Sequence, residues 1–369
     1  MDYIGIGLTG YDLNVCKKLA NKLISKRTEI ENFISVSCET DSVKLCPLEG
    51  YISVYEKNSL IYYSYSSDLK LEESGNRFII KIDNIKEKYR DGYIPVIIIP
   101  DEFFRKFIDC ELNKNIMTIK IDDIKSSIDS SLKLYNKCTY RITLTDYDDV
   151  CNLIAKLWKH RECGGALSKD MILQMVKCNM LIRNGDIENV SYASYDLSLG
   201  DEYYYNGKVR TLDNSQPFIP IEPYDYIIAS TKEMIAFPRD VVGRFDLVVG
   251  LFFEGIILSN STQVDPGFNG KLFCLLFNTS NKTVYLKRGM KFSTIEFNKL
   301  IEPTEAYNGT HAYEESMVSY LPRNIMNGAI NELKKDVEKL RTENAKMQQL
   351  YVASLAIMIA VLALKVIGG

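Results

Sequence analysis

The sequence has little histidine, no paired-cysteine motif and almost no net charge. Only His160 and His311 are present, which leaves few imidazoles to serve as metal ligands. Nine cysteines occur without a CxxC pair, so neither a zinc ribbon nor a disulfide framework is indicated, and the odd count fits a reducing compartment. The 45 Lys and Arg residues nearly balance 48 Asp and Glu residues, which excludes a strongly basic surface for nucleic acid.

The amino end also lacks the basic region and long apolar stretch of a secretion signal. The carboxyl end, in contrast, is strongly apolar, since Lys365 is the only charged residue between Val352 and Ile367. This segment is short for a transmembrane helix, but it spans a bilayer if the lysine reaches the far interface. We therefore expect residues 351–369 to form a tail anchor, with the bulk of the chain in the cytoplasm. A buried core helix and the end of a coiled coil are the alternatives.

Residues 326–350, just before this tail, carry a heptad pattern of apolar side chains. The pattern comprises Ile330, Val337, Asn344 and Tyr351 at one position and Leu333, Leu340 and Met347 at the other. Such a repeat predicts a short coiled-coil stalk, and β-branched residues with leucines favour a dimer. A single amphipathic helix docked on the globular body is the alternative interpretation.

Residues 1–162 alternate apolar runs with segments of helical spacing, which predicts an α/β domain with a doubly wound sheet. We expect strands near 3–8, 94–100 and 116–121, a turn at 9–12, and helices near 14–24, 101–107 and 146–159. The opening residues resemble those of P-loop nucleoside monophosphate kinases. However, no Lys-Ser/Thr pair follows Gly10, so the resemblance implies a degenerate kinase-like fold without the phosphate site.

Residues 163–322 have a different pattern. Ser168 is expected to cap a helix, and short apolar runs separated by turn residues then predict a β-sandwich, jelly roll or barrel. The expected strands include 226–231, 245–253, 272–277, 283–286 and 292–297.

His160-Arg-Glu162 matches half of the signature of zinc deaminases. No P-C-x-x-C element completes it, so we predict no metal site and place His160 at a helix C-terminus, where a cation is favourable.

Four sequence islands in this second part point to a family. They are Leu167-Ser-Lys-Asp-Met-Ile, Ala193-Ser-Tyr-Asp-Leu-Ser-Leu-Gly, Val264-Asp-Pro-Gly-Phe-Asn-Gly and Leu286-Lys-Arg-Gly-Met-Lys-Phe. In this order, residues 165–320 resemble the dCTP deaminase and dUTPase family, and the deaminase branch more than the dUTPases. The resemblance implies a trimeric β-barrel of nucleotide metabolism that needs no cofactor.

The resemblance also implies that the catalytic machinery has been replaced. The family's triphosphate-binding Arg-Ser-Ser-x-x-Arg segment aligns with residues 248–255, so Val249, Gly250 and Phe253 stand where hydroxyl and guanidinium donors are expected. The glutamate that activates water in the deaminase branch aligns with Leu275, which has no proton to exchange. A family glutamine aligns with Thr294. We therefore predict no catalytic residue.

What remains of a ligand pocket is predicted to lie around the Asp-Pro-Gly turn. Its candidate residues are Gln263, Asp265, Gly267, Tyr307 and Tyr313. Phe252, Phe253 and Leu275 would make the neighbouring surface apolar, which argues against a nucleotide ligand. Asp196, in the second island, is expected to serve folding through turn chemistry.

Together these features predict a membrane-anchored pseudoenzyme that forms homo-oligomers. We expect four parts: 1–162, 163–322, the stalk 326–350 and the anchor 351–369. Trimer is favoured, because the family resemblance implies it and three heptads set oligomer state only weakly. The role is structural, as a scaffold, or ligand-sensing. An active dCTP deaminase or dUTPase, and a nucleotide-sensing membrane effector, are the alternatives.

Overall fold

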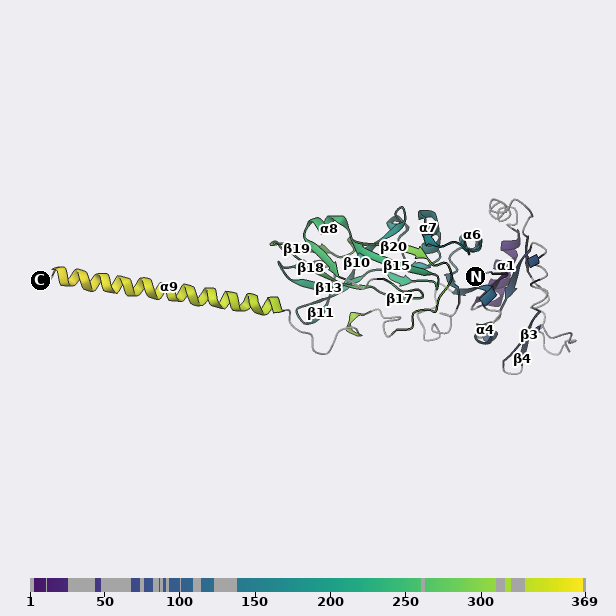
Figure 1. Cartoon of the computed structure of the whole chain (residues 1–369), viewed down its shortest axis with the longest axis horizontal. Coiled ribbons are helices and arrows are strands. Elements are labelled where there is room, and N and C mark those ends of the chain that lie inside the picture. The colour runs from purple at the N-terminus through teal and green to yellow at the C-terminus, as the bar shows by residue number, and fades with distance from the viewer. Residues whose placement is uncertain are drawn as a thin grey trace.

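A computed structural model shows an elongated chain with three parts in a row (Figure 1). An α/β domain lies at one end, a β-rich head lies in the middle, and one long helix leaves the head on the opposite side. The structure describes residues 3–10, 12–25, 44–47, 68–73, 76–81, 86, 89–90, 93–99, 101–108, 114–122, 138–259, 263–309, 316–319 and 329–367.

The N-terminal domain is built on a five-stranded parallel sheet in the order β2-β5-β1-β6-β7. Every residue of the central strand β1 is buried, as expected for a parallel strand covered on both faces. The elements are β1 (Gly5–Gly10), α1 (Leu13–Ser25), β2 (Lys44–Pro47), the hairpin β3 (Asp68–Glu73) and β4 (Asn76–Lys81), β5 (Tyr93–Ile98), α4 (Asp101–Ile108), β6 (Ile116–Asp122), β7 (Tyr140–Thr143) and α6 (Tyr147–Lys159).

These elements confirm the predicted α/β class and most predicted boundaries in this domain. Asp146 caps α6 by accepting hydrogen bonds from the next backbone amides, and Val150, Ile154 and Leu157 are buried as their spacing predicts. The predicted turn at residues 9–12 is wrong at its start. Thr9 and Gly10 continue β1, because they pair with Lys120 and Ile121 of the longer neighbouring strand β6.

The head is dominated by a curled antiparallel sheet in the order β15-β20-β10-β13-β18-β16, with β11 and β8 at its sides. Its elements are β8 (Gly165–Ala166), α7 (Lys169–Lys177), β9 (Leu181–Arg183), η4 (Ile187–Asn189), β10 (Ser194–Tyr205), β11 (Lys208–Thr211), β12 (Phe218–Ile221), β13 (Tyr226–Thr231), β14 (Met234–Ala236), β15 (Val241–Leu247), α8 (Val249–Phe253), β16 (Ile256–Ser259), β17 (Asn269–Gly270), β18 (Phe273–Asn278), β19 (Val284–Lys287), β20 (Lys291–Lys299) and η5 (Met317–Ser319).

Two local predictions in the head have clear outcomes. Ser168 caps α7, since its hydroxyl oxygen accepts the Met171 amide at 3.4 Å. The single strand predicted over 245–253 is wrong, because β15 ends at Leu247 and α8 follows directly. The periodicity of a short apolar run does not distinguish a helix from a strand. Within α8, Leu251 alone is buried, so the remaining apolar side chains of this run are not part of the core.

The long helix α9 (Ala329–Ile367) runs without interruption through the predicted stalk and into the predicted anchor. Its segment Lys335–Ala363 is long and apolar enough to cross a membrane, and the chain itself does not bury this segment. The apolar heptad side chains Leu333, Val337, Leu340 and Met347 are likewise exposed. The side chains of this helix whose burial the structure describes therefore contribute nothing to the core of the head.

The N-terminal domain and the head share a set of backbone contacts. The Thr143 amide donates to the Cys178 carbonyl at 3.0 Å, which joins β7 to the end of α7. Lys299, the last residue of β20, donates from Nζ to the carbonyls of His160, Arg161 and Cys163 at 2.9, 3.1 and 2.9 Å. The cation at the C-terminus of α6 is thus Lys299 rather than His160, since burial and the neighbouring lysines lower the pKa of that imidazole.

Candidate functional site

The Asp-Pro-Gly turn between β16 and β17 brings four of the five predicted pocket residues together. The Gln263 amide donates from Nε2 to Oδ1 of Asp265 at 2.9 Å. Gly267 adopts a positive φ of 77°, and the Tyr307 amide donates to the Pro266 carbonyl at 2.8 Å. Tyr313, the fifth residue, lies outside the described residues.

Residues 303–307 pass directly over this turn, and we call them the strap. A side chain at Gly267 would approach the Ala306 Cβ to 2.5 Å, so only glycine fits under the strap. The Tyr307 ring packs against Phe268 with centroids 5.6 Å apart. Arg239 reaches the strap from the other side, since its Nε donates to the Thr304 carbonyl at 2.6 Å. The turn is therefore tightly built.

The segment that the resemblance aligns with the family's phosphate-binding motif contains a short helix in this structure. Val249 and Gly250 begin the short helix α8, which only Val248 separates from the end of β15. Val249 is 67 % exposed and Phe253 is 81 % exposed, while a Cβ on Gly250 would meet nothing within 4 Å. The side chains that α8 presents to solvent at these positions offer no hydrogen-bond donor for a phosphate oxygen.

Leu275 lies on one face of the large sheet, which we call the sheet face. Side chains on β18 alternate, so Cys274 and Leu276 point into the core while Leu275 remains half-buried on the other side. Its cross-strand neighbours are Ile228 on β13 and Ser259 on β16. The apolar side chains of the sheet face on β13, β16 and β18 are Ile228, Ile257, Phe273, Leu275 and Phe277.

Glu202 of β10 points to the same side of the sheet, two strands away from β18. Its carboxylate accepts hydrogen bonds from the Ser316 hydroxyl at 2.7 Å and from the Met317 amide at 2.8 Å. The carboxylate is therefore engaged in holding the segment after the strap. Leu275 itself supplies no proton, so the position that the resemblance assigns to the catalytic base is apolar.

Thr294, at the position of the family glutamine, is part of a cross-strand contact. Its hydroxyl donates to Asp196 Oδ1 at 3.0 Å, and Lys291 lies 3.3 Å from the other oxygen of this carboxylate. Asp196 and Thr294 are register partners in β10 and β20. Asp196 therefore connects β10 with β20, and the predicted turn chemistry is wrong because the residue lies within a strand.

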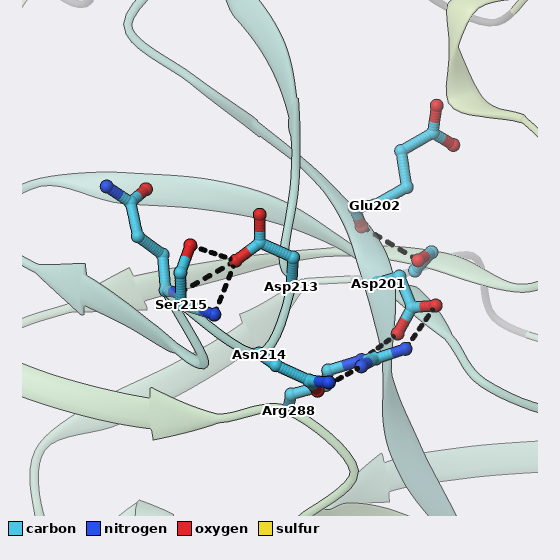
Figure 2. Close-up of polar contacts among 8 residues, drawn as sticks. Asp201, Glu202, Asp213, Asn214, Ser215 and Arg288 are labelled. Carbon is cyan, nitrogen blue, oxygen red and sulfur yellow. Dashed lines mark hydrogen bonds and ion pairs between the residues drawn. The ribbon is translucent and has the colours of Figure 1, made fainter.

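A second polar cluster involves Arg288, which lies in the last sequence island (Figure 2). Its guanidinium forms a two-point ion pair with Asp201, with Nε and Nη2 at 2.5 and 3.0 Å from the carboxylate oxygens. Nη1 reaches Asn214 at 3.4 Å. Asp213, beside it, accepts hydrogen bonds from the Ser215 hydroxyl at 2.6 Å and from the Gln216 and Ser215 amides, and these bonds lower the pKa of that carboxyl. These contacts tie the β10–β11 region to the β19–β20 turn.

Sequence reasoning missed a buried network where the head meets the N-terminal domain. The Tyr140 hydroxyl donates to Asp240 Oδ2 at 2.5 Å, and Lys299 Nζ lies 3.8 Å from the same oxygen. Burial raises the pKa of Asp240, although Tyr140 and Lys299 oppose this shift. No local signal marks these residues, since they lie far apart in the sequence and Pro238-Arg-Asp240 resembles an exposed turn.

Among the described residues, no group of three or more His, Cys, Asp or Glu side chains is arranged to hold a metal ion. Six of the described cysteines, Cys16, Cys138, Cys151, Cys163, Cys178 and Cys274, are free thiols, and all of these except Cys163 are buried. The described geometry therefore contains a tightly built turn, an apolar sheet face and exposed aromatic residues on α8.

The head has relatives of known classification. The dCTP deaminase-like family matches residues 166–300. A dCTP deaminase of Thermococcus kodakarensis is 37 % identical over 137 residues, which cover 37 % of this chain and 87 % of that protein. A dCTP deaminase of Pyrococcus horikoshii is 34 % identical over 37 % of this chain and 86 % of its own length.

A solved 2'-deoxycytidine 5'-triphosphate deaminase from Agrobacterium tumefaciens is 17 % identical, covers 37 % of this chain and 49 % of its own, and has a TM-score of 0.33. The residues matched by the family, 166–300, lie in the head and not in the N-terminal sheet or α9. Through its head, the chain belongs to the dCTP deaminase-like family.

Proposed function

We propose that this protein is a membrane-anchored, non-catalytic oligomer whose deaminase-like head serves assembly rather than deamination. The observation that carries the proposal is Leu275. It occupies the position of the family's water-activating glutamate and lies half-buried on an apolar sheet face beside Ile228. A leucine neither accepts nor donates a proton, so general acid–base catalysis at this position is lost.

Binding of a triphosphate at the family site is disfavoured for a second, independent reason. A phosphate that leaves water needs charged or polar donors to replace its hydration. The short helix α8 begins with Val249 and Gly250 and ends with Phe253, and its exposed side chains are apolar. A nucleotide ligand at this position therefore has no compensating contacts on α8.

Self-association, with a trimer favoured, is supported by the apolar surfaces that the single chain leaves uncovered. Phe252 and Ile257 are more than half exposed, and Leu275 and Phe277 on the same sheet are half-buried. Contiguous apolar surface of this kind is typical of protein interfaces. The exposed heptad residues of α9 add a second contact region, which favours a stalk over residues 326–350.

Membrane attachment is supported by the apolar segment of α9, and we place residues 1–322 on the cytoplasmic side. The N-terminal part, residues 1–162, would be a degenerate kinase-like domain. Its central β1 lies between β5 and β6 in an all-parallel sheet, and the Lys120 ammonium pairs with Asp101 at 2.6 Å at the carboxyl ends of these strands.

The decisive experiment uses the full chain in detergent micelles, incubated with dCTP or with dUTP. The expected result is no release of ammonia or pyrophosphate above background, with the Thermococcus kodakarensis relative as the active control. Turnover at a rate comparable to that control would overturn the proposal. Leu275→Glu should remain inactive, because the phosphate donors are still missing.

Anchoring is tested separately by fractionation of cells that express the full chain. The protein should stay with membranes after alkaline carbonate washing, and protease added outside should not reach the head. Leu355→Lys combined with Leu362→Lys should release it, whereas lysines at the exposed stalk positions Gln348 and Gln349 should not. Retention of the Leu355 and Leu362 double variant would contradict a spanning helix.

A further inference from the structure

The long helix α9 carries an apolar stripe that the chain itself does not cover. In the heptad notation a to g, Val337 and Tyr351 occupy position a, while Leu333, Leu340 and Met347 occupy position d. All five side chains are exposed. Residues that alternate between steps of three and four lie on one side of a helix, and such a stripe is buried when it packs against other helices.

Charged and polar side chains flank this stripe on its two sides. Position g holds Asp336 and Glu343, position e holds Arg341 and Gln348, and all four are exposed. Parallel helices place each g residue beside the e residue five positions further along the partner, so Asp336 meets Arg341 and Glu343 meets Gln348. Antiparallel helices place g beside g and e beside e, so that carboxylates face each other. The charges therefore favour parallel helices.

Asn344, at position a, favours the same direction and also fixes the register. In parallel, in-register helices the Asn344 amides of all copies lie in one layer, where they form hydrogen bonds with one another. Any other alignment places this amide against an apolar residue such as Leu340 or Met347, and a buried amide without a partner is costly.

We propose that α9 joins copies of this chain in a parallel, in-register bundle, and that this contact continues from the stalk into the membrane segment. The partner is a second copy, because the acidic g side and the complementary e side lie on the same helix. This rests on the self-association proposed above and adds the direction, the register and the face of the contact. Dimers and trimers both bring g beside e in this way.

The helix passes from the stalk to the membrane segment without a break. α9 contains no proline or glycine, the residues that most often kink a helix, so the stripe keeps its direction. Its next positions are Ser354, Met358 and Val361. Ser354 is the only polar residue within 352–363, and its hydroxyl donates to the Tyr351 carbonyl at 2.9 Å. Polar side chains in membrane helices face other helices, which supports the same stripe.

Cysteine cross-linking tests this arrangement in membranes of cells that express the full chain. α9 has no cysteine, so the wild-type chain gives the background. Single cysteines replace Leu340, Met347, Ser354 or Val361, all at position d, and are then oxidised. We expect each variant to form same-site disulfide dimers at least about fivefold above background, because disulfides need Cα atoms within about 7 Å. Leu340 and Met347 lie about 10 Å apart along the helix, so antiparallel copies would cross-link at one of them at most.

Lys346→Cys, on the outer side of the stalk, and Ala360→Cys, on the opposite face of the membrane segment, are the matched controls and should stay at background. Cross-linking at no more than one d position would overturn the parallel, in-register bundle. Cross-linking of Ala360→Cys in place of Val361→Cys would show that small residues form the contact within the membrane, which would overturn its continuation there.

Analytical ultracentrifugation of the wild-type chain in detergent separates this proposal from self-association itself. A monomeric chain would overturn both. An oligomer whose d positions do not cross-link would overturn only the arrangement of α9, since the heads would then hold the copies together.

Charge exchange gives a second readout. Arg341→Glu should weaken association at least about threefold, because Asp336 of each copy then faces a like charge. Adding Asp336→Lys should restore the affinity, since the pair is exchanged rather than removed. Lys346→Glu, at an outward position, is the matched control and should have no effect, and circular dichroism shows whether each variant keeps its helix. If the double variant associates as weakly as Arg341→Glu alone, the parallel pairing is wrong.

Discussion

The two ends of the head differ in how their side chains are used. Toward the N-terminal domain, the Asp-Pro-Gly turn lies under the strap, and the buried Tyr140, Asp240 and Lys299 groups contact one another. Around α8 and the sheet face, apolar side chains remain exposed or half-buried. The first region is complete within one chain, whereas the second has the properties of a surface that another molecule covers.

This difference separates stability from assembly. Substitutions near the strap should change the free energy of unfolding of a single chain, because they disturb contacts made within it. Substitutions on the sheet face and α8 should change self-association, because their side chains contribute little to the fold. The experiments below, ordered by expected size, test whether this division holds.

The largest effect is expected from Gly267→Ala. This residue has a φ of 77°, and the new Cβ would lie 2.5 Å from the Ala306 Cβ. Left-handed strain and the steric clash together should lower the free energy of unfolding by about 2–4 kcal/mol, measured by urea denaturation.

The control for this variant is Gly289→Ala. Gly289 has a φ of 73°, but its Cβ would meet nothing within 4 Å. Only the backbone strain remains there, so the cost should be about 1 kcal/mol. Equal losses for the two variants would show that the packing of the strap on the turn contributes nothing.

The second effect concerns the sheet face. Leu275→Glu places a charge among apolar side chains on the surface proposed to contact other copies, and a charge without a partner disfavours burial. We expect self-association to weaken at least about tenfold, which corresponds to about 1.4 kcal/mol, in analytical ultracentrifugation of the full chain in detergent. Leu275→Met, of similar volume, should associate as the wild-type protein does. If Leu275→Glu also associates as tightly as the wild-type protein, this face is not part of the interface.

The third effect is a dependence on pH. Burial raises the pKa of Asp240, so folding favours its protonated form. This contribution to stability is present below the unfolded pKa, about 3.9, and is lost as pH rises through the higher pKa of the folded protein.

Thermal melting should therefore show a gain in stability as pH falls from neutral toward mildly acidic values. Asp240→Asn removes the ionisation but keeps an acceptor for the Tyr140 hydroxyl. It should flatten this part of the curve, and an unaltered slope would assign the dependence to another buried acid such as Glu233, whose pKa burial also raises.

The smallest effect on stability is expected at Phe253, which is 81 % exposed on α8. Phe253→Ala should change the free energy of unfolding by less than about 0.5 kcal/mol, as for other exposed positions. Leu251→Ala, at the buried position of the same helix, should cost about 2 kcal/mol or more. A large loss for Phe253→Ala would mean that the ring supports the single chain after all.

Much of the fold was predictable from short-range patterns. The buried run of β5 and the spacing of α1 and α6 indicated an α/β domain, since these periodicities depend only on neighbouring residues. The sequence islands identified the deaminase-like head and placed Gln263, Asp265, Gly267 and Tyr307 in one candidate pocket, which the structure brings together.

Other features depended on contacts that no local pattern contains. Residues 245–253 were predicted to be one strand, yet the β15–β20 ladder ends at Leu247 and Val249–Phe253 turns into α8. Asp196 looked like a turn residue, but its partner Thr294 is almost one hundred positions away. The loss of catalysis at the family positions, the trimer and the tail anchor remain predictions.

By itself, the sequence determined the type of most elements, the family of the head and the apolar character of the last helix. These properties follow from composition, spacing and motifs, which act over a few residues at a time. Only the tertiary structure decided which distant groups meet: Tyr140 with Asp240, and the strap with Gly267. The physical reason is that such contacts depend on how two domains and a curled sheet pack, and packing geometry is not written in any short stretch of chain.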